Sequence, residues 1–333
     1  MNILKRFFLP AVTAIIIFSG SLVFAQGEIV RGIELYDGTF VYGKVVKMSA
    51  DEVVVQKKDG KTFSCKFDEV KSFIDTDDAA SQLEKNKKSA TGRHVWKIGP
   101  EFSSIKYEEP GVMKEKGMMY GVGAAYSYHN GVMFGADIKY SYGQVDYESN
   151  GSGTINDIDD NMLEIRGVGG YDFKMSSSFV LTPFFGFGYR YLRDDTSGRT
   201  STTGARGYLR ESNYYYSPLG LTASKDFNNG WTIGLTLEYD IFWKGVQKSY
   251  LRDANPGFNN LENDQSSGHG MRGSLLISKK IAKISFALEP YIKYWDIGKS
   301  DNKLITFNGV PWGIGWEPEN NSTEVGVKFR VIF

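Results

Sequence analysis

The sequence predicts an all-β protein, a ten-stranded antiparallel transmembrane β-barrel that follows a smaller β-barrel-like domain. Three observations predict this fold. Long segments after residue 94 alternate apolar and polar residues, short and long connections alternate between them, and the chain ends on an apolar stripe that reaches Phe333. A strand with lipid on one side and a polar lumen on the other requires this period of two.

Residues 1–25 are expected to be a signal peptide. Lys5 and Arg6 precede an apolar run that ends near Phe18, and Val23 and Ala25 place small residues before a cleavage site. A single membrane anchor is the alternative, but the run is shorter than the roughly 20 apolar residues of a spanning helix. We therefore expect the mature chain to start near Gln26.

Residues 26–74 are expected to form a small β-domain. Five short strands are predicted, with tight turns at Asp37-Gly38 and Asp59-Gly60. The phrases "DGTFVYGKV" and "KDGKTFSCKF" resemble an Sm-like or SH3-like small β-barrel, which implies a module that binds peptides or partner proteins. Residues 75–93 carry no Phe, Tyr, Trp, Ile or Val, so they are expected to be a linker.

Residues 94–333 are expected to form the barrel, and each predicted strand is long enough to cross a bilayer at a tilt. The predicted strands are residues 95–107, 117–129, 131–146, 161–174, 179–194, 211–226, 230–245, 268–280, 283–297 and 322–333. In the seventh, the apolar face is expected to run from Trp231 to Trp243, with Lys244 on the other face.

The connections are short after strands two, four, six and eight, and long, polar and glycine-rich after the odd-numbered strands. Short turns on one side and long loops on the other are typical of Gram-negative outer-membrane barrels. With an even number of strands, both barrel ends lie on the short-turn side, which places the N-terminal domain in the periplasm.

The last strand resembles the C-terminal strand of bacterial outer-membrane β-barrel proteins, which is a signal for membrane insertion. The matching residues are Val325, Val327, Phe329, Val331 and Phe333. The phrase "LEPYIKYWDIGKS" (288–300) is similar to the penultimate strand of a porin-like family of largely unassigned function. This resemblance implies location in the cell outer membrane, contact with its lipid and lipopolysaccharide, and recognition by the barrel assembly machinery.

Composition argues against several other classes of protein. The 39 basic and 39 acidic residues balance, whereas a nucleic-acid-binding protein needs a basic excess. The single Cys65 has no partner for an internal disulfide, and no cofactor or metal site is expected. The run "NDIDDN" (156–161) offers oxygen ligands for Ca²⁺ but lacks the glycine and final Glu of an EF-hand, so we expect a solvated acidic loop.

Charged residues on the polar face of the strands are expected to face the lumen. They are Asp137, Lys139, Glu164, Arg166, Asp172, Arg190, Glu238, Asp240, Arg272, Glu289, Lys293, Lys328 and Arg330. Side chains largely fill a barrel of this size, and a buried ion must be paired or hydrated. Two interpretations follow: a plug of ion pairs, or a narrow pore of mixed charge.

The alternative to a non-enzymatic barrel is a barrel enzyme of protease or lipase type at the extracellular rim. Omptin proteases have barrels of this size and use Asp-Asp and Asp-His pairs there. Of the three histidines, His94 and His129 are expected at the periplasmic end, and His269 lies among glycines in "SSGHGMRG". We therefore expect a non-enzymatic protein with a structural, surface-interaction or narrow-pore role, and possible periplasmic partners of the N-terminal domain.

Overall fold

The computed structural model describes residues 32–57, 59–73 and 92–333, and the chain divides into two compact units, Met1–Ala90 and Thr91–Phe333. The predicted signal peptide lies outside the described residues, as does the predicted linker apart from its last two residues. No helix in the described ranges is long and apolar enough to cross a bilayer.

The described part of the first unit contains six strands and one 3₁₀ turn. They are β1 (Gly32–Leu35), β2 (Phe40–Tyr42), β3 (Lys44–Met48), β4 (Val53–Gln56), β5 (Thr62–Cys65), η1 (Phe67–Glu69) and β6 (Val70–Phe73). β2 and β3 are separated at Gly43, where an added Cβ would lie 2.1 Å from the Gln56 carbonyl oxygen.

Two three-stranded sheets, ordered β2-β1-β6 and β3-β4-β5, share one core in this unit. Both predicted turns are present, with Gly38 and Gly60 at positive φ. The buried core side chains come from both sheets: Ile33, Leu35, Val41, Val53, Val55 and Cys65. The six strands fit the expectation of a small β-domain, and its likeness to an Sm-like barrel stays a prediction.

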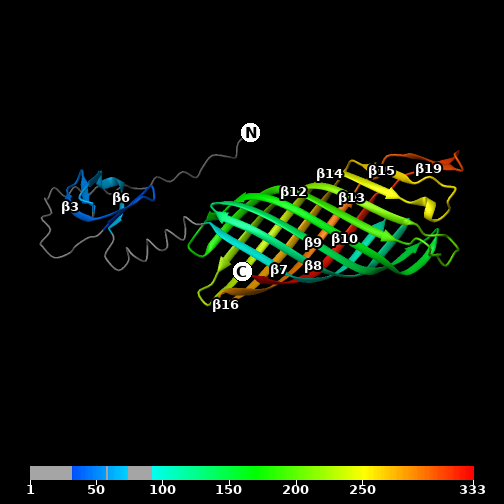
Figure 1. Cartoon of the computed structure of the whole chain (residues 1–333), viewed down its shortest axis with the longest axis horizontal. Coiled ribbons are helices and arrows are strands. Elements are labelled where there is room, and N and C mark those ends of the chain that lie inside the picture. The colour runs from blue at the N-terminus through cyan, green and yellow to red at the C-terminus, as the bar shows by residue number, and fades with distance from the viewer. Residues whose placement is uncertain (1–31, 58, 74–91) are drawn as a thin grey trace, which may run out of the picture. The chain divides into compact units, whose positions relative to one another are not determined.

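In the described part of the second unit, ten long strands form a closed antiparallel barrel (Figure 1). They are β7 (Arg93–Glu109), β8 (Met113–Asn130), β9 (Val132–Ser149), β10 (Gly153–Tyr171), β12 (Phe179–Asp195), β13 (Leu209–Asp226), β14 (Trp231–Ser249), β16 (Gly268–Ile281), β17 (Ile284–Ile297) and β20 (Asn320–Ile332). The barrel closes where β20 pairs with β7, and β10 pairs with β12. The prediction of ten strands is confirmed.

Shorter elements complete the barrel unit. They are β11 (Phe173–Lys174), η2 (Leu251–Asp253), β15 (Leu261–Gln265), β18 (Lys303–Phe307) and β19 (Val310–Gly315). In Figure 1, β15 and β19 lie at the end of the barrel opposite the C-terminus. That end carries the long connections, as the sequence predicts.

Two of the predicted long loops are instead extensions of the strands. β7 and β8 are joined by residues 110–112, and β9 and β10 by residues 150–152, so both hairpins continue beyond the predicted strand ends. The run "NDIDDN" therefore belongs to β10 rather than to a loop, with a bulge between Ile155 and Ile158. The outward side chains of these extensions are polar. The apolar alternation that predicts the other strand segments is therefore missing there.

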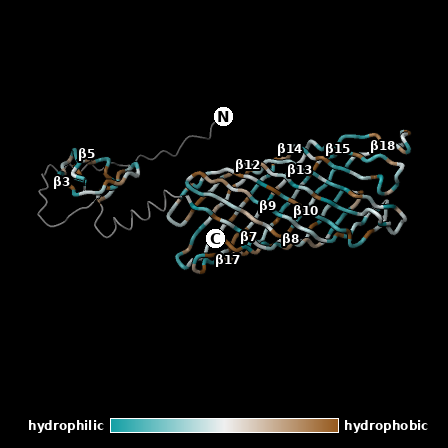
Figure 2. The backbone as a smooth tube through the Cα atoms, in the orientation of Figure 1, coloured by the Kyte–Doolittle hydropathy of each residue, from teal (hydrophilic) through white to brown (hydrophobic). Residues whose placement is uncertain are grey.

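The outward face of the barrel carries a band of exposed apolar and aromatic side chains. In Figure 2 the barrel strands carry both hydrophobic and hydrophilic residues along their length. At the short-turn end, Trp96 and Phe333 exchange backbone hydrogen bonds of 2.8 and 3.0 Å across the closing seam. Towards the other end, the apolar outward positions stop at Phe102 on β7, Met118 on β8 and Tyr142 on β9. Aromatic residues at both edges of such a band match the two surfaces of a bilayer.

Beyond this band the strands continue with polar outward residues, among them Lys106, Glu108, Lys114, Lys116, Gln144, Asp146, Glu148, Asp159, Arg193 and Asp195. The barrel therefore has an outer part that stands clear of the lipid. On β14 a bulge opposite Tyr215 and Tyr216 turns Lys244 outward, where it pairs with Asp264 at 3.0 Å. The expectation that Lys244 faces the lumen is wrong, because the extra residue inverts the alternation.

Candidate functional site

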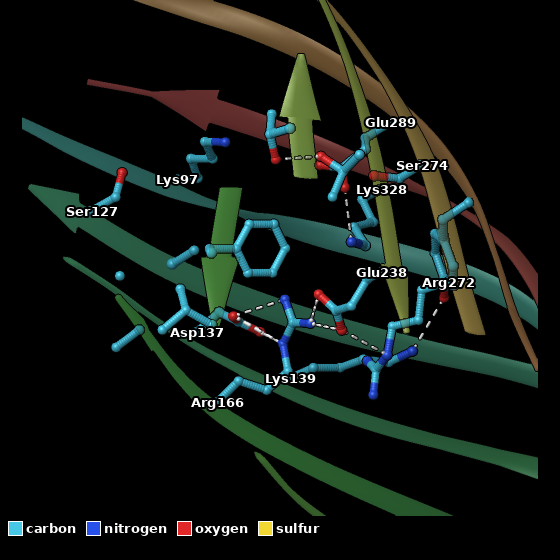
Figure 3. A pocket seen from close by; sticks show the side chains of 18 of the residues that line it. Lys97, Ser127, Asp137, Lys139, Arg166, Glu238, Arg272, Ser274, Glu289 and Lys328 are labelled. Carbon is cyan, nitrogen blue, oxygen red and sulfur yellow. Dashed lines mark hydrogen bonds and ion pairs between the residues drawn. The ribbon is translucent and has the colours of Figure 1, made fainter. Parts of the chain in front are cut away.

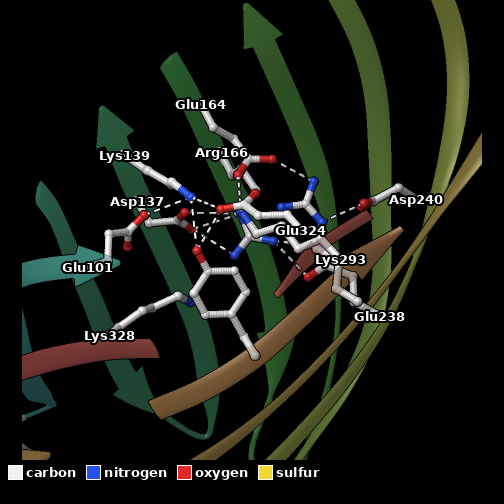
Figure 4. A network of polar contacts seen from close by, with 12 residues as sticks. Glu101, Asp137, Lys139, Glu164, Arg166, Glu238, Asp240, Lys293, Glu324 and Lys328 are labelled. Atoms are coloured by element: carbon white, nitrogen blue, oxygen red, sulfur yellow. Dashed lines mark hydrogen bonds and ion pairs between the residues drawn. The ribbon is translucent and has the colours of Figure 1, made fainter. Parts of the chain in front are cut away.

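The candidate site is the interior of the barrel, where charged side chains from non-neighbouring strands meet (Figure 4). Lys139 on β9 is 5% exposed, and its ammonium contacts Glu101 on β7 at 2.8 Å and Glu324 on β20. The Tyr291 hydroxyl donates a hydrogen bond of 2.6 Å to Glu324. Since β9 and β20 do not pair with each other, these contacts cross the lumen.

A second set of contacts is centred on two arginines. Arg166 lies between Asp137 at 3.0 Å and Glu238 at 2.6 Å (Figure 3). Arg272 contacts Glu164 at 2.6 Å, Glu238 at 3.1 Å and Asp240 at 2.5 Å. Four strands, β9, β10, β14 and β16, are linked in this way through their inward side chains.

Lys293 on β17 joins the two sets. Its ammonium lies 2.8 Å from Glu164 and 3.7 Å from Glu324. We call these joined ion pairs the lumen plug, defined by Glu101, Asp137, Lys139, Glu164, Arg166, Glu238, Asp240, Arg272, Tyr291, Lys293 and Glu324. Most of its charges are almost completely buried, so their pairing offsets a desolvation cost of several kcal/mol per ion.

The remaining predicted lumen residues lie around the plug. Arg330 contacts Glu101 at 2.7 Å, and Lys328 contacts Glu289 at 2.9 Å. Arg190 is 3% exposed, with its guanidinium 5.6 Å from the ring of Trp295. Asp172 lies at the short-turn end, where it contacts His129 at 2.7 Å.

A cavity of about 280 Å³ lies between the plug and the short-turn end of the barrel (Figure 3). It extends from Glu238 and Tyr291 to Val95, Ser127 and His129. We call it the inner vestibule. Asp137 and Arg166 have side chains that are 28% and 20% exposed, so the plug meets solvent on this side.

The outer part of the barrel contains a separate group of buried acids. Asp160 and Asp194 are directly opposite each other on β10 and β12, and Glu115 on β8 lines the same cavity of about 40 Å³. These residues lie beyond the lipid-facing band, beside outward residues such as Lys114, Asp159 and Arg193. Burial, followed by repulsion from Asp194, raises the pKa of Asp160 to about 8.

Above this cavity, Arg210 contacts Glu109 at 2.8 Å and also Glu317. The Tyr107 hydroxyl lies 3.1 Å from an oxygen of each carboxylate and can donate its one hydrogen to either. This group closes the interior towards the loops. Among the residues that the structure describes, no group of His, Cys, Asp and Glu side chains is placed to hold a metal ion.

Several residues of the interior were absent from the sequence-based set. Glu101, Tyr291 and Glu324 complete the plug, and Glu115, Asp160 and Asp194 form the acidic group. Alternation alone could have found Glu101, which lies between outward Pro100 and Phe102, and Glu324, which directly precedes outward Val325. The sequence predicts a loop at Asp160 because its strand is polar on both faces.

The three histidines lie outside the plug. The ring of His94 packs at a tilt against Tyr126 and Tyr128, and His129 contacts Asp172 at the short-turn end. His269 stacks on Tyr239 with ring centroids 5.9 Å apart, on the outward face at the edge of the lipid-facing band. His269 therefore points away from the interior acids.

Comparison with known proteins supports the membrane assignment. Residues 102–254 match the family model of the autotransporter beta-domain. The outer membrane protease OmpT from Escherichia coli has a similar fold, with a TM-score of 0.52 and 10% identity over 72% of this chain and 95% of that chain. The comparison with curated protein sequences gives no match.

Other solved barrels are less similar. The translocator domain of the autotransporter NalP from Neisseria meningitidis aligns with a TM-score of 0.35 and 15% identity, over 76% of this chain and 98% of that chain. The toluene transporter TbuX of Ralstonia pickettii aligns with a TM-score of 0.31 and 10% identity, over 71% and 88%. The closed ten-stranded fold, the lipid-facing band and the family match together identify this chain as an outer-membrane β-barrel protein.

Proposed function

We propose that the protein is a closed, non-enzymatic barrel that anchors and presents its outer surface rather than conducting solutes. The observation that carries this proposal is the lumen plug. Its ion pairs connect β7, β9, β10, β14, β16, β17 and β20 across the interior. An ion that crosses the lumen would have to break several buried ion pairs.

The outer end supports a presenting role. The hairpin of β18 and β19 exposes Leu304, Val310, Trp312, Ile314 and Trp316, each at least 49% exposed. Exposed apolar groups of this kind, outside the lipid-facing band, are typical of contact surfaces. We also propose a periplasmic protein partner for residues 26–74, which the barrel would anchor to the membrane.

Single-channel recording in planar bilayers tests the closed state. The full chain is expected to insert without conductance steps. A variant that removes two pairs together, Lys139→Ala/Glu324→Ala with Glu164→Ala/Arg272→Ala, is expected to open stepwise. The matched control, Lys114→Ala/Glu148→Ala, removes an exposed pair of 3.0 Å and is expected to stay silent.

Two further measurements separate the alternatives. A chain lacking residues 26–93 is expected to be as silent as the full chain, because the plug belongs to the barrel alone. Steady conductance of the unmodified protein would refute the closed state. Hydrolysis of lipid or peptide by the purified protein, lost in His269→Ala, would refute the non-enzymatic role.

A further inference from the structure

The acidic group in the outer part of the barrel is not used by the proposed function. Asp160 and Asp194 are register partners on neighbouring strands, and both side chains point inward. Like charges directly opposite each other destabilise a sheet. Glu115 reaches the same cavity from β8, which is separated from β10 by β9.

The surrounding cations do not balance these acids. Five inward carboxyl groups lie in this region: Glu109, Glu115, Asp160, Asp194 and Glu317. Arg210 faces Glu115 and Asp194 but is already in contact with Glu109 and Glu317. Arg190 faces Asp160. The negative charge of Asp195, on the outward face, repels that of Asp194. Asp195 itself contacts Arg193 at 2.6 Å. Full ionisation would therefore leave a buried excess of negative charge.

Two oxygens in this group lack a donor. Among the described residues, no donor reaches Glu115 Oε1 or Asp194 Oδ1, although both atoms are buried. Glu115 is only 8% exposed. An ionised carboxylate only accepts hydrogen bonds, whereas a protonated one also donates. The cavity of about 40 Å³ has room for about one water molecule, which is too little for a substrate.

We propose that this group is a proton-binding site, in which Glu115 and Asp194 share one proton and Asp160 holds a second, and that release of these protons loosens the outer end of the barrel. A proton between the two unpartnered oxygens satisfies both of them. Protonation of Asp160 also removes the like-charge contact between the register partners.

The direction of the pH dependence follows from burial. Burial, and then the charges of Asp194 and Asp160, raise the pKa of Glu115 well above its usual range. Burial also raises the pKa of Asp194, against the opposing charge of Arg210. The pKa values of these acids are higher in the folded protein than in the unfolded chain. Their contribution to the free energy of unfolding is therefore fully present below about pH 4. It is lost as the pH rises towards the value of about 8 for Asp160.

Infrared spectroscopy of the full chain in lipid vesicles tests the shared proton directly. The unmodified protein is expected to show the C=O stretch of a buried carboxylic acid near pH 6, and this band is expected to weaken as the pH rises past the value of about 8 for Asp160. Glu115→Gln is expected to reduce this band by about half, because one of two buried protons is removed. Glu148→Gln, an exposed acid on β9 with a side chain 58% exposed, is the matched control and is expected to leave the band unchanged.

Limited proteolysis of the loop over residues 196–208 tests the loosening. At about pH 10 the unmodified protein and Glu148→Gln are expected to be cut about ten-fold faster than Glu115→Gln, whose amide still donates a hydrogen bond to Asp194. Absence of the acid band near pH 6 overturns the proton site. If Ca²⁺ removes the acid band at that pH, the site binds a cation rather than protons. Equal cleavage rates in the unmodified protein and Glu115→Gln overturn the loosening.

Discussion

The contact between Lys139 and Glu324 is the most direct test of the lumen plug. We consider Lys139→Met, which keeps the aliphatic stem, and Glu324→Gln, which keeps the shape of the side chain. Removing one partner of a buried pair costs about 3–5 kcal/mol when the other is left unpaired. In this barrel each remaining charge keeps some compensation, so the expected costs lie at or below the lower end of that range.

The contacts that remain after each substitution determine how much free energy of unfolding is lost. After Lys139→Met, Glu324 keeps the Tyr291 hydroxyl at 2.6 Å and Lys293 at 3.7 Å, so we expect a loss of about 3 kcal/mol. After Glu324→Gln, Lys139 keeps Glu101 at 2.8 Å, so we expect about 2 kcal/mol. The double variant leaves no unpaired charge at this position and is expected to lose about 3 kcal/mol, which gives a coupling of about 2 kcal/mol.

Urea unfolding of the barrel in lipid vesicles, followed by tryptophan fluorescence, measures the four free energies of unfolding. The control cycle uses Lys114→Met and Glu148→Gln, whose side chains are 40% and 58% exposed. Exposed pairs couple by about 0.5 kcal/mol or less. If the Lys139–Glu324 cycle gave no more than this control, the plug would not be a set of buried, interdependent ion pairs.

Two other predictions concern the two units separately. Gly143→Ala places a Cβ 2.1 Å from the Met118 carbonyl oxygen and is expected to cost about 1–3 kcal/mol of barrel stability, whereas the control Gly167→Ala meets nothing within 4 Å and is expected to be neutral. Cys65 is 8% exposed, and burial, then the charge of Glu69, raises the pKa of its thiol, so native protein is expected to resist maleimide. Val55→Ala, at a fully buried position, is expected to cost about 2 kcal/mol and to speed this labelling about thirty-fold, while barrel unfolding stays unchanged. Rapid labelling of the unmodified protein, or a stable Gly143→Ala barrel, would contradict the packing described for each unit.

The sequence predicts the parts of the fold that depend on neighbouring residues. Alternation identifies the outward face of β14 from Trp231 to Trp243, because lipid requires an apolar residue at every second position. The same rule fails one residue later at Lys244, since a bulge changes the phase without a local signature in the sequence. Alternation also fails to identify β10 near Asp160, because the strand leaves the lipid there and its outward residues are polar.

The partners in the site depend on information that a single strand does not carry. Lys139 and Glu324 are 185 residues apart and lie on strands that do not pair. Their contact depends on the tilt of the strands and on the stagger at which the sheet closes. Sequence reasoning therefore predicts which charges enter the lumen on most strands, but it cannot assign their pairs.

The inner vestibule has an electrical consequence. An electrolyte that enters the vestibule conducts ions, so a voltage between the two sides of the membrane would fall mainly across the packed layer of the interior, which begins at Lys139, Arg166 and Arg272 and ends at the group around Arg210. A charge that moved fully across that layer would gain roughly 2.3 kcal/mol for every ~100 mV. The layer that blocks the lumen is thus also the part of the molecule on which an electric field acts most strongly.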